Sequence, residues 1–247
     1  MKSNLWQRTD RQLSRAILWK PIQSWFHVFS LTLFFCFALV MVPDTSKSLN
    51  FFVDTTADTT DANANDCICS DSNGECSLRA AVMEANSCLG GDAISIPGGM
   101  YILTIPSNFA DSDINSESGD LDVAESLNIV GDTIEPVTIS GNGASRIFDV
   151  GNGVRFRLSH LTIENGNPTN IAGNARVSGG AVYALANSSV STSNVSFEGN
   201  IAENGGALYI QSGTNLTMTS SSMIENTATD DAGALFLNSN SRVILSD

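Results

Sequence analysis

One short stretch of the chain carries the side chains best suited to acid–base chemistry. Arg155, Arg157 and His160 form the only basic cluster beyond residue 48, and His160 is the only histidine there. Cleavage of an acidic polysaccharide needs a base, with acidic residues that neutralise the uronate or hold calcium. In the next repeat of the chain Ser189 and Ser191 stand beside the arginines, so no acid accompanies the cluster. We therefore expect a solvated strand face with a polar corner, and a polysaccharide-cleaving enzyme is the alternative.

The loop Asp71-Ser-Asn-Gly-Glu75 offers oxygen ligands at spacings that part of an EF-hand calcium loop also has. Asp71, Asn73 and Glu75 alternate along it, but the full ligand spacing and the distal glutamate are missing. The sequence favours an ordinary Asx turn at this place. We expect no metal and no other cofactor, with calcium at these three residues as the alternative.

Three aromatic residues recur at one position of successive repeats: Tyr183, Tyr209 and Phe236. They alternate with apolar residues that point inward, so we expect them to point outward and to stack on the surface. Exposed aromatic patches often mark interaction sites, although stacking alone would also stabilise the fold. These are the candidate ligand-binding residues, and a surface glycan or a protein is the expected partner.

Four cysteines beyond residue 48 lie within 22 residues of one another. An even number of cysteines in an exported chain indicates two disulfides. A Cys67–Cys69 bond would be strained, which leaves two pairings, and we favour Cys69–Cys76 with Cys67–Cys88. The Cys-x-Cys spacing is poor for zinc and no histidine is near, so a zinc site is disfavoured.

The elements that position these residues come from a repeat. Gly-Gly-Ala-Val-Tyr at 179–183 returns as Gly-Gly-Ala-Leu-Tyr at 205–209 and as Ala-Gly-Ala-Leu-Phe at 232–236, with periods of 26 and 27 residues. Fixed periods of about 20–50 residues are typical of solenoids, propellers and arrays. Apolar residues alternate within each unit, and Ser, Thr, Asn and Gly dominate, which indicates short strands joined by turns.

Aligned repeat on repeat, the apolar residues fall at the same strand positions and so face one way. Stacking such units predicts a right-handed parallel β-helix over 92–247, whose hand follows from the rule for parallel crossovers. The residues expected inside are Leu208, Ile210, Leu216 and Met218. Asn200 and Asn226 are expected to stack at one corner. The strands are expected at 101–105, 127–130, 137–140, 147–150, 156–163, 207–211, 215–219 and 221–223. The last repeat has no cap, and truncation at the C-terminal end is left open.

Residues 1–48 have the character of a targeting segment. Five basic residues lie in the first 20 positions, and an apolar run at 26–42 follows and ends at Pro43. This pattern predicts a secretory signal with a long basic region. An uncleaved membrane anchor is the alternative, because the run is at the short limit for spanning a bilayer.

Without this segment, six basic residues remain against 24 acidic ones, a formal net charge of −18. A negative field of this size repels nucleic acid and anionic membranes. We therefore expect no nucleic-acid partner, and contact with a membrane only through the N-terminal segment.

A short helix is expected at 77–86, with Ser77 as its N-cap and Leu78, Val82 and Ala85 on one face. It should cover the apolar end of the first coil. This stretch, Cys76-Ser-Leu-Arg-Ala-Ala followed by Glu-Ala-Asn at 84–86, resembles the CSLREA domain of bacterial secreted β-helix proteins. Ala80 stands where the name motif of that domain has glutamate, so the capping box lacks its reciprocal partner.

The unit Phe-Glu-Gly-Asn at 197–200, followed by Gly-Gly-Ala-Leu-Tyr, is similar to the short repeats of chlamydial polymorphic outer-membrane proteins. Neither resemblance supplies a catalytic residue, and both imply an exported protein, often on the cell surface. We predict a disulfide-bonded cap at 49–91 and a β-helix at 92–247. The predicted function is that of a secreted or cell-surface, non-catalytic scaffold or adhesin-like binding protein. A pectin-lyase-like polysaccharide lyase or glycoside hydrolase is the alternative.

Overall fold

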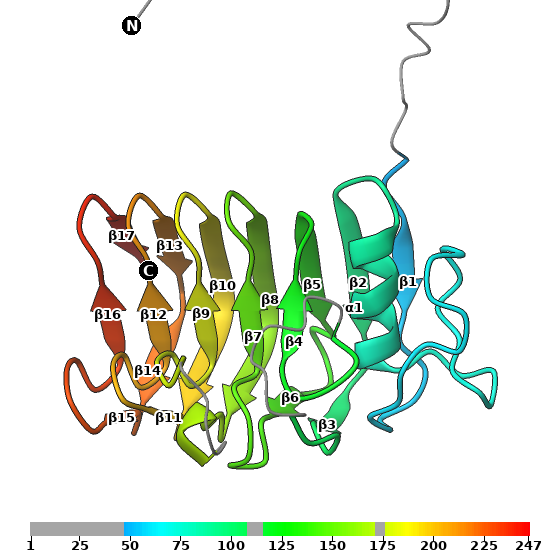
Figure 1. Ribbon diagram of the computed structural model, residues 1–247, viewed down its shortest axis with the longest axis horizontal. Helices are drawn as coiled ribbons and strands as arrows, with labels where there is room; N and C mark the ends of the chain where they lie inside the picture. Colours follow the sequence, from blue (N-terminus) through cyan, green and yellow to red (C-terminus); the bar gives the residue numbers. More distant parts are fainter. Residues whose placement is uncertain (1–46, 108–115, 171–175) are drawn as a thin grey trace, which may run out of the picture. The chain divides into compact units, whose positions relative to one another are not determined.

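The computed structural model describes residues 47–107, 116–170 and 176–247. The predicted targeting segment lies outside these residues, except for its last two positions. The described chain is mostly β, with parallel sheets and one α-helix. Strands that are far apart in the sequence lie side by side in chain order (Figure 1).

All pairings between the described strands are parallel. The ten-stranded sheet consists of β1 (Asn50–Phe52), β2 (Asp92–Ile96), β3 (Gly99–Ile102), β5 (Leu127–Gly131), β6 (Val137–Ser140), β8 (Arg155–Glu164), β10 (Ser189–Glu198), β13 (Asn215–Thr219), β14 (Ser222–Ile224) and β17 (Arg242–Ser246). The five-stranded sheet consists of β4 (Leu121–Val123), β7 (Phe148–Val150), β9 (Val182–Ala184), β12 (Leu208–Ile210) and β16 (Leu235–Leu237). A two-stranded sheet joins β11 (Ile201–Ala202) and β15 (Thr227–Ala228).

The strand register confirms the alignment of the repeats. Leu208 pairs with Val182 on one side and with Leu235 on the other. The four side chains predicted to lie inside are at most 4% exposed, namely Leu208, Ile210, Leu216 and Met218. Alternation of side chains along each strand therefore places the apolar column inward and the polar columns outward.

The Gly-Gly-Ala start of the repeats at residues 179 and 205 has a steric cause. Gly179 and Gly205 have φ of 64° and 58°, which is the left-handed region that favours glycine. At the next position there is no room for a side chain, because a Cβ on Gly206 would lie 2.1 Å from the carbonyl oxygen of Gly233. The alanine that follows, such as Ala207, is completely buried. The first glycine of the motif thus allows a bend, and the second allows a close contact between backbones.

A stacked asparagine pair holds the predicted corner. Asn200 is fully buried, and its Nδ2 donates to Oδ1 of Asn226 at 3.0 Å and to the carbonyl of Ile163 at 3.0 Å. Its Oδ1 accepts from the backbone N–H of Gly166 at 2.9 Å. This side chain therefore satisfies backbone groups that the corner would otherwise leave unpaired.

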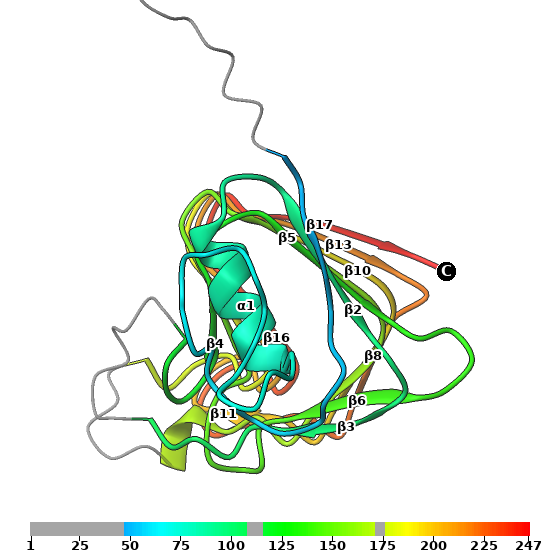
Figure 2. The same cartoon turned by 90° about the vertical axis from the view of Figure 1, so that its right-hand side faces the viewer.

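The helix α1 (Leu78–Ser87) lies across one end of the stacked strands (Figure 2). Ser77 is its N-cap and accepts from the backbone N–H of Ala80, as predicted. Leu78, Val82 and Ala85 are at most 3% exposed and belong to the main apolar core. The helix thus buries the apolar ends of the first strands.

Five strands and one short helix were not among the expected elements: β1, β2, β4, β11, β15 and η1 (Pro168–Asn170). β1 precedes residue 92 and extends the sheet by pairing with β2, because alternating Leu-Asn-Phe-Phe-Val continues the strand pattern. The 3-10 turn η1 follows Asn167, whose Oδ1 caps it by accepting from the backbone N–H of Thr169 at 3.1 Å.

Candidate functional site

The aromatic column lies on β9, β12 and β16, where Tyr183, Tyr209 and Phe236 are register partners. Successive ring centroids are 5.0 Å apart, and the ring planes differ by 5° and 3°. The predicted stacking is therefore present. The predicted surface strip of three rings is wrong in one respect, since Tyr183 is only 8% exposed while the other two rings are half-buried.

Charged side chains cover Tyr183. The guanidinium carbons of Arg146 and Arg176 lie 5.0 and 5.7 Å from its ring centroid, which is cation–π distance. Asp149 holds both arginines, at 3.1 Å from Arg146 and 2.9 Å from Arg176. Burial is the main cause that raises the pKa of the Tyr183 phenol, and the Gln211 amide donates to its oxygen at 2.6 Å. Tyr183 thus anchors the column to a charged network.

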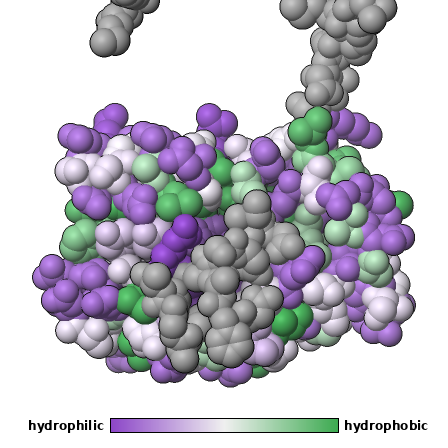
Figure 3. All heavy atoms as spheres, in the orientation of Figure 1, coloured by the Kyte–Doolittle hydropathy of each residue, from purple (hydrophilic) through white to green (hydrophobic). Residues whose placement is uncertain are grey.

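Stacking limits what the column can bind. Tyr209 is stacked between Tyr183 and Phe236, so both faces of its ring are covered and only the edge is open. Phe236 is stacked on one side only by a described aromatic ring. Polar residues predominate on the visible part of this face, with apolar residues scattered among them (Figure 3). Among the described rings, Phe236 therefore has one face that no ring of the column covers.

The structure separates the basic cluster. Arg155 and Arg157 are exposed on β8 and stand beside Ser189 and Ser191, as the alignment predicts. His160 lies three residues farther on, at a corner where its φ is 56°. It lines a groove of ≈ 450 Å³ that neither arginine lines. The three side chains therefore do not form one catalytic group.

The same groove contains acids that the sequence reading missed. Asp132 and Glu135 line it together with His160 and belong to the loop that joins β5 and β6. The expectation that no acid accompanies the cluster is therefore wrong for His160. The alignment of the repeats could not predict these acids, because the loop is an insertion and its residues have no counterpart in the other repeats.

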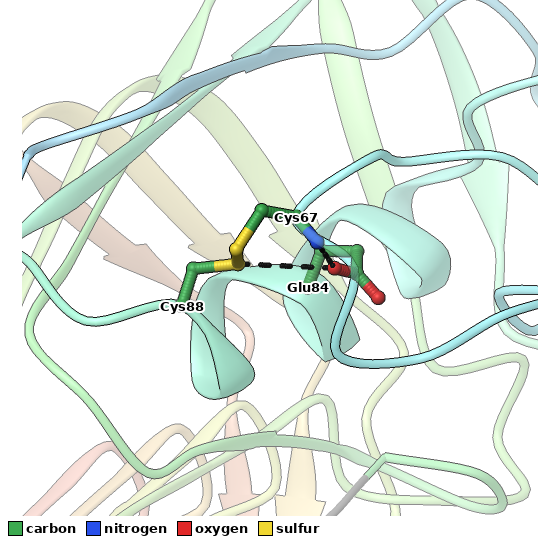
Figure 4. Close-up of side chains that lie close together, drawn as sticks. All are labelled: Cys67, Glu84 and Cys88. Carbon is green, nitrogen blue, oxygen red and sulfur yellow. Dashed lines mark hydrogen bonds between the residues drawn. A yellow bond between two sulfur atoms is a disulfide. The ribbon is translucent and has the colours of Figure 1, made fainter.

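The cysteines lie in the two pairs that the sequence favoured, Cys67–Cys88 and Cys69–Cys76, with Cα–Cα separations of 5.7 and 5.1 Å. The carboxylate of Glu84 lies beside the first pair (Figure 4). It accepts from the backbone N–H of Cys67 at 2.6 Å and of Asn65 at 2.9 Å, and burial raises its pKa. Because the sulfurs are bonded to each other, they offer no thiolate to a metal, and the group is structural.

The weak calcium candidate forms a turn. Oδ1 of Asp71 accepts from the backbone N–H of Asn73 at 2.7 Å and of Glu75 at 3.0 Å, which is the Asx turn that the sequence favoured. The hydrogen bond from Glu75 is the main cause that lowers the pKa of Asp71. The turn explains the contacts of this carboxylate, and calcium at these residues stays the alternative to the expected absence of a metal.

A buried arginine was not singled out from the sequence. Arg79 of α1 is completely buried, and its Nε pairs with Asp58 at 2.6 Å. Its other nitrogens donate to the carbonyls of Ser116 at 2.9 Å and Gly119 at 2.8 Å. Five donors in a planar fork suit this role, so the arginine joins the cap to the first repeats.

Comparisons with known proteins bear on one repeat. Residues 194–211 match the Chlamydia polymorphic membrane protein (Chlamydia_PMP) repeat, which supports the similarity seen in this part of the sequence. No curated protein and no solved structure matches the chain. The resemblance of residues 76–86 to the CSLREA domain stays a prediction. Within the described ranges, no helix has the length and the apolar character that crossing a membrane requires.

Proposed function

We propose that residues 49–247 form a right-handed parallel β-helix with α1 as its N-terminal cap. Three observations support this architecture: parallel pairing throughout the described strands, a spacing of 26 or 27 residues between the partners of β9, β12 and β16, and an apolar interior. Parallel crossovers are right-handed in nearly all proteins, which gives the hand.

On this scaffold we propose an exported, cell-surface protein that binds a glycan or a protein and catalyses no reaction. The match to a repeat of polymorphic membrane proteins supports a surface location, as does the signal-like segment at 1–48. Two disulfides fit an oxidising compartment. The observation that carries the proposal is the aromatic column, whose Phe236 end presents a ring next to the edge of Tyr209.

Substitutions along the column separate binding from stability. Phe236→Ser should weaken attachment of the purified full chain to host cells or arrayed glycans by about tenfold, as expected for an aromatic anchor. Tyr183→Phe is the matched control, because it keeps the stack and alters only a ring that is covered by arginines. It should leave binding unchanged.

Both outcomes are read against the melting temperature of each variant. Suppose that Phe236→Ser lowers the melting temperature but that the folded variant binds as tightly as the parent chain. The column is then structural, and the proposed binding role is wrong. Equal loss of binding in Tyr183→Phe would also contradict the assignment of the Phe236 end.

A carbohydrate-active enzyme is the second candidate. The observation that favours it is the groove in which His160 lies with Asp132 and Glu135, since a base and carboxylic acids are the groups that glycoside hydrolysis uses. Release of reducing ends from a polysaccharide, abolished by Glu135→Gln, would establish this function. A lyase is less well supported, because Arg157 does not line the groove.

A further inference from the structure

The groove beside His160 is bounded by an inserted loop. In the later repeats β8 and β10 each run for ten residues through this corner, whereas β5 and β6 are separated by residues 132–136. The loop between β5 and β6 projects beyond the neighbouring turns of the chain (Figure 2). Its residues line the groove together with His160 and Asn194.

The loop is built to hold its shape. Oδ1 of Asp132 accepts from the backbone N–H of Ile134 at 2.6 Å and of Glu135 at 3.2 Å. The loop also packs directly on Gly98, where a Cβ would lie 2.2 Å from the Cβ of Glu135. A loop fixed in this way needs little ordering when a ligand binds.

Polar groups line the groove, some already bonded within the chain and some not. Thr162, Ser196 and Ser222 are register partners, so their hydroxyls form a row at the spacing of adjacent strands. The hydroxyls of Ser196 and Ser222 lie 2.9 Å apart, and that of Ser196 donates to Glu198 at 2.6 Å. Neither the imidazole of His160 nor the carboxylate of Glu135 has a hydrogen bond or an ion pair with another described residue. These groups are therefore available to a ligand or to water.

The lining selects the class of ligand. No lysine or arginine lines the groove, and two carboxylates do, so an anionic polymer is disfavoured. An extended peptide would need an open sheet edge, but β8 and β10 are paired on both sides. Sugar hydroxyls, in contrast, both donate and accept, and they match carboxylates, an amide and a row of hydroxyls. Ile134, 85% exposed at the loop, adds an apolar contact for a sugar ring.

We propose that this groove is a binding site for a neutral oligosaccharide, with Glu135, His160 and Asn194 as its hydrogen-bonding residues. The site is separate from the aromatic column, and it requires no catalytic step. The chain would then contact a glycan along the side of the stacked strands, across successive repeats.

Titration of the purified full chain with neutral glucose hexasaccharides tests the proposal, with β-1,4, β-1,3 and α-1,4 linkages as separate probes. At least one should bind with a Kd of about 1 mM or tighter in calorimetry. Glu135→Gln and His160→Asn should each weaken this binding by about tenfold, the effect of losing a hydrogen bond to a charged or well-placed group. His160→Asn keeps a residue that accepts the left-handed corner, as Asn194 does in the next repeat.

Glu125→Gln serves as the matched control, because Glu125 is an exposed acid that does not line the groove. It should bind like the parent chain. Absence of binding to all three hexasaccharides would overturn the proposal. So would tighter binding of an oligogalacturonate or a lysine-rich peptide, or hexasaccharide binding that both groove variants leave unchanged. Loss of binding in Phe236→Ser with the groove variants intact would assign the glycan to the aromatic column instead.

Discussion

The two ends of the described chain hold themselves together differently. The buried charged residues lie before Gly151, and they include Arg79, Glu84 and Arg146, each held by hydrogen bonds or ion pairs. Among described residues after that point, burial is apolar or neutral, and backbone ladders with the Asn200 corner carry the structure. The segments before Gly151 differ in sequence and are held together by specific polar contacts. The later repeats are similar in sequence, and each pairs with an equivalent strand of its neighbour.

One register column shows how burial depends on the neighbouring repeat. Met218 is 4% exposed, but its partner Leu245 in the last described repeat is 68% exposed. Ile210 and Leu237 differ in the same way, at 0% and 42%. By sequence pattern the two residues of each pair are equivalent. They differ in burial because a following repeat covers Met218 and Ile210 but no described repeat covers Leu245 and Leu237. Each repeat of a stacked array contacts only its neighbours, so its stability is local.

The largest loss of stability is expected on removal of the buried Arg79, which pairs with Asp58 in the region before Gly151. Arg79→Ala leaves Asp58 and several carbonyl oxygens buried without their partner, and it should cost about 3–5 kcal/mol of unfolding free energy. Arg157→Ala, at an exposed position of β8, should change it by about 0.5 kcal/mol or less. Urea unfolding followed by circular dichroism measures both. A loss below about 1 kcal/mol for Arg79→Ala would show that the charge network does not hold the cap.

Truncation of two leucines on the neighbouring strands β13 and β17 sharpens the comparison of repeats. Leu216→Ala removes a completely buried side chain and should cost about 2–5 kcal/mol. Leu245→Ala should cost well under about 1 kcal/mol, because most of that side chain is already in water. The same urea experiment applies. Equal losses at the two positions would mean that Leu245 is covered in solution.

A single alanine distinguishes the third repeat from the others. Ala232 has φ of 56° where the earlier repeats have Gly179 and Gly205. The left-handed conformation costs a residue with a Cβ about 1–2 kcal/mol, part of which Gly loses again as chain entropy. Ala232→Gly should therefore stabilise the chain by about 1 kcal/mol or less and raise the melting temperature slightly. A lower melting temperature would show that the corner is not strained.

The smallest effect is a pH dependence at the start of β2. Burial raises the pKa of Asp92, which lies at an inward position beside Leu127. Because the folded chain then binds the proton more tightly than the unfolded chain, this group stabilises most below the unfolded pKa of 3.8, and that contribution is lost as pH rises through the folded value. Asp92→Asn should flatten the fall in stability between pH 4 and 7. A parallel pH profile in parent and variant would contradict a raised pKa.

The strand repeats were predictable because their signal is local and periodic. Alternation gave the inward column, and the 26- and 27-residue spacing gave the partners of Leu208. The capping helix was predictable from Ser77 and one apolar face. β1 was missed because it lies outside the repeats and pairs with β2 at a separation of 43 residues, so no fixed period marks it.

The sequence by itself determined which residues of successive repeats are partners, because side-chain alternation and a fixed period leave little choice of register. It could not decide how deeply each partner is buried, and so it placed Tyr183 on the surface. Only the tertiary structure brought Arg146 and Arg176 over that ring and the loop acids into the groove that His160 lines. Such contacts join residues outside the repeat, and their positions depend on how insertions fold back on the stack rather than on any period.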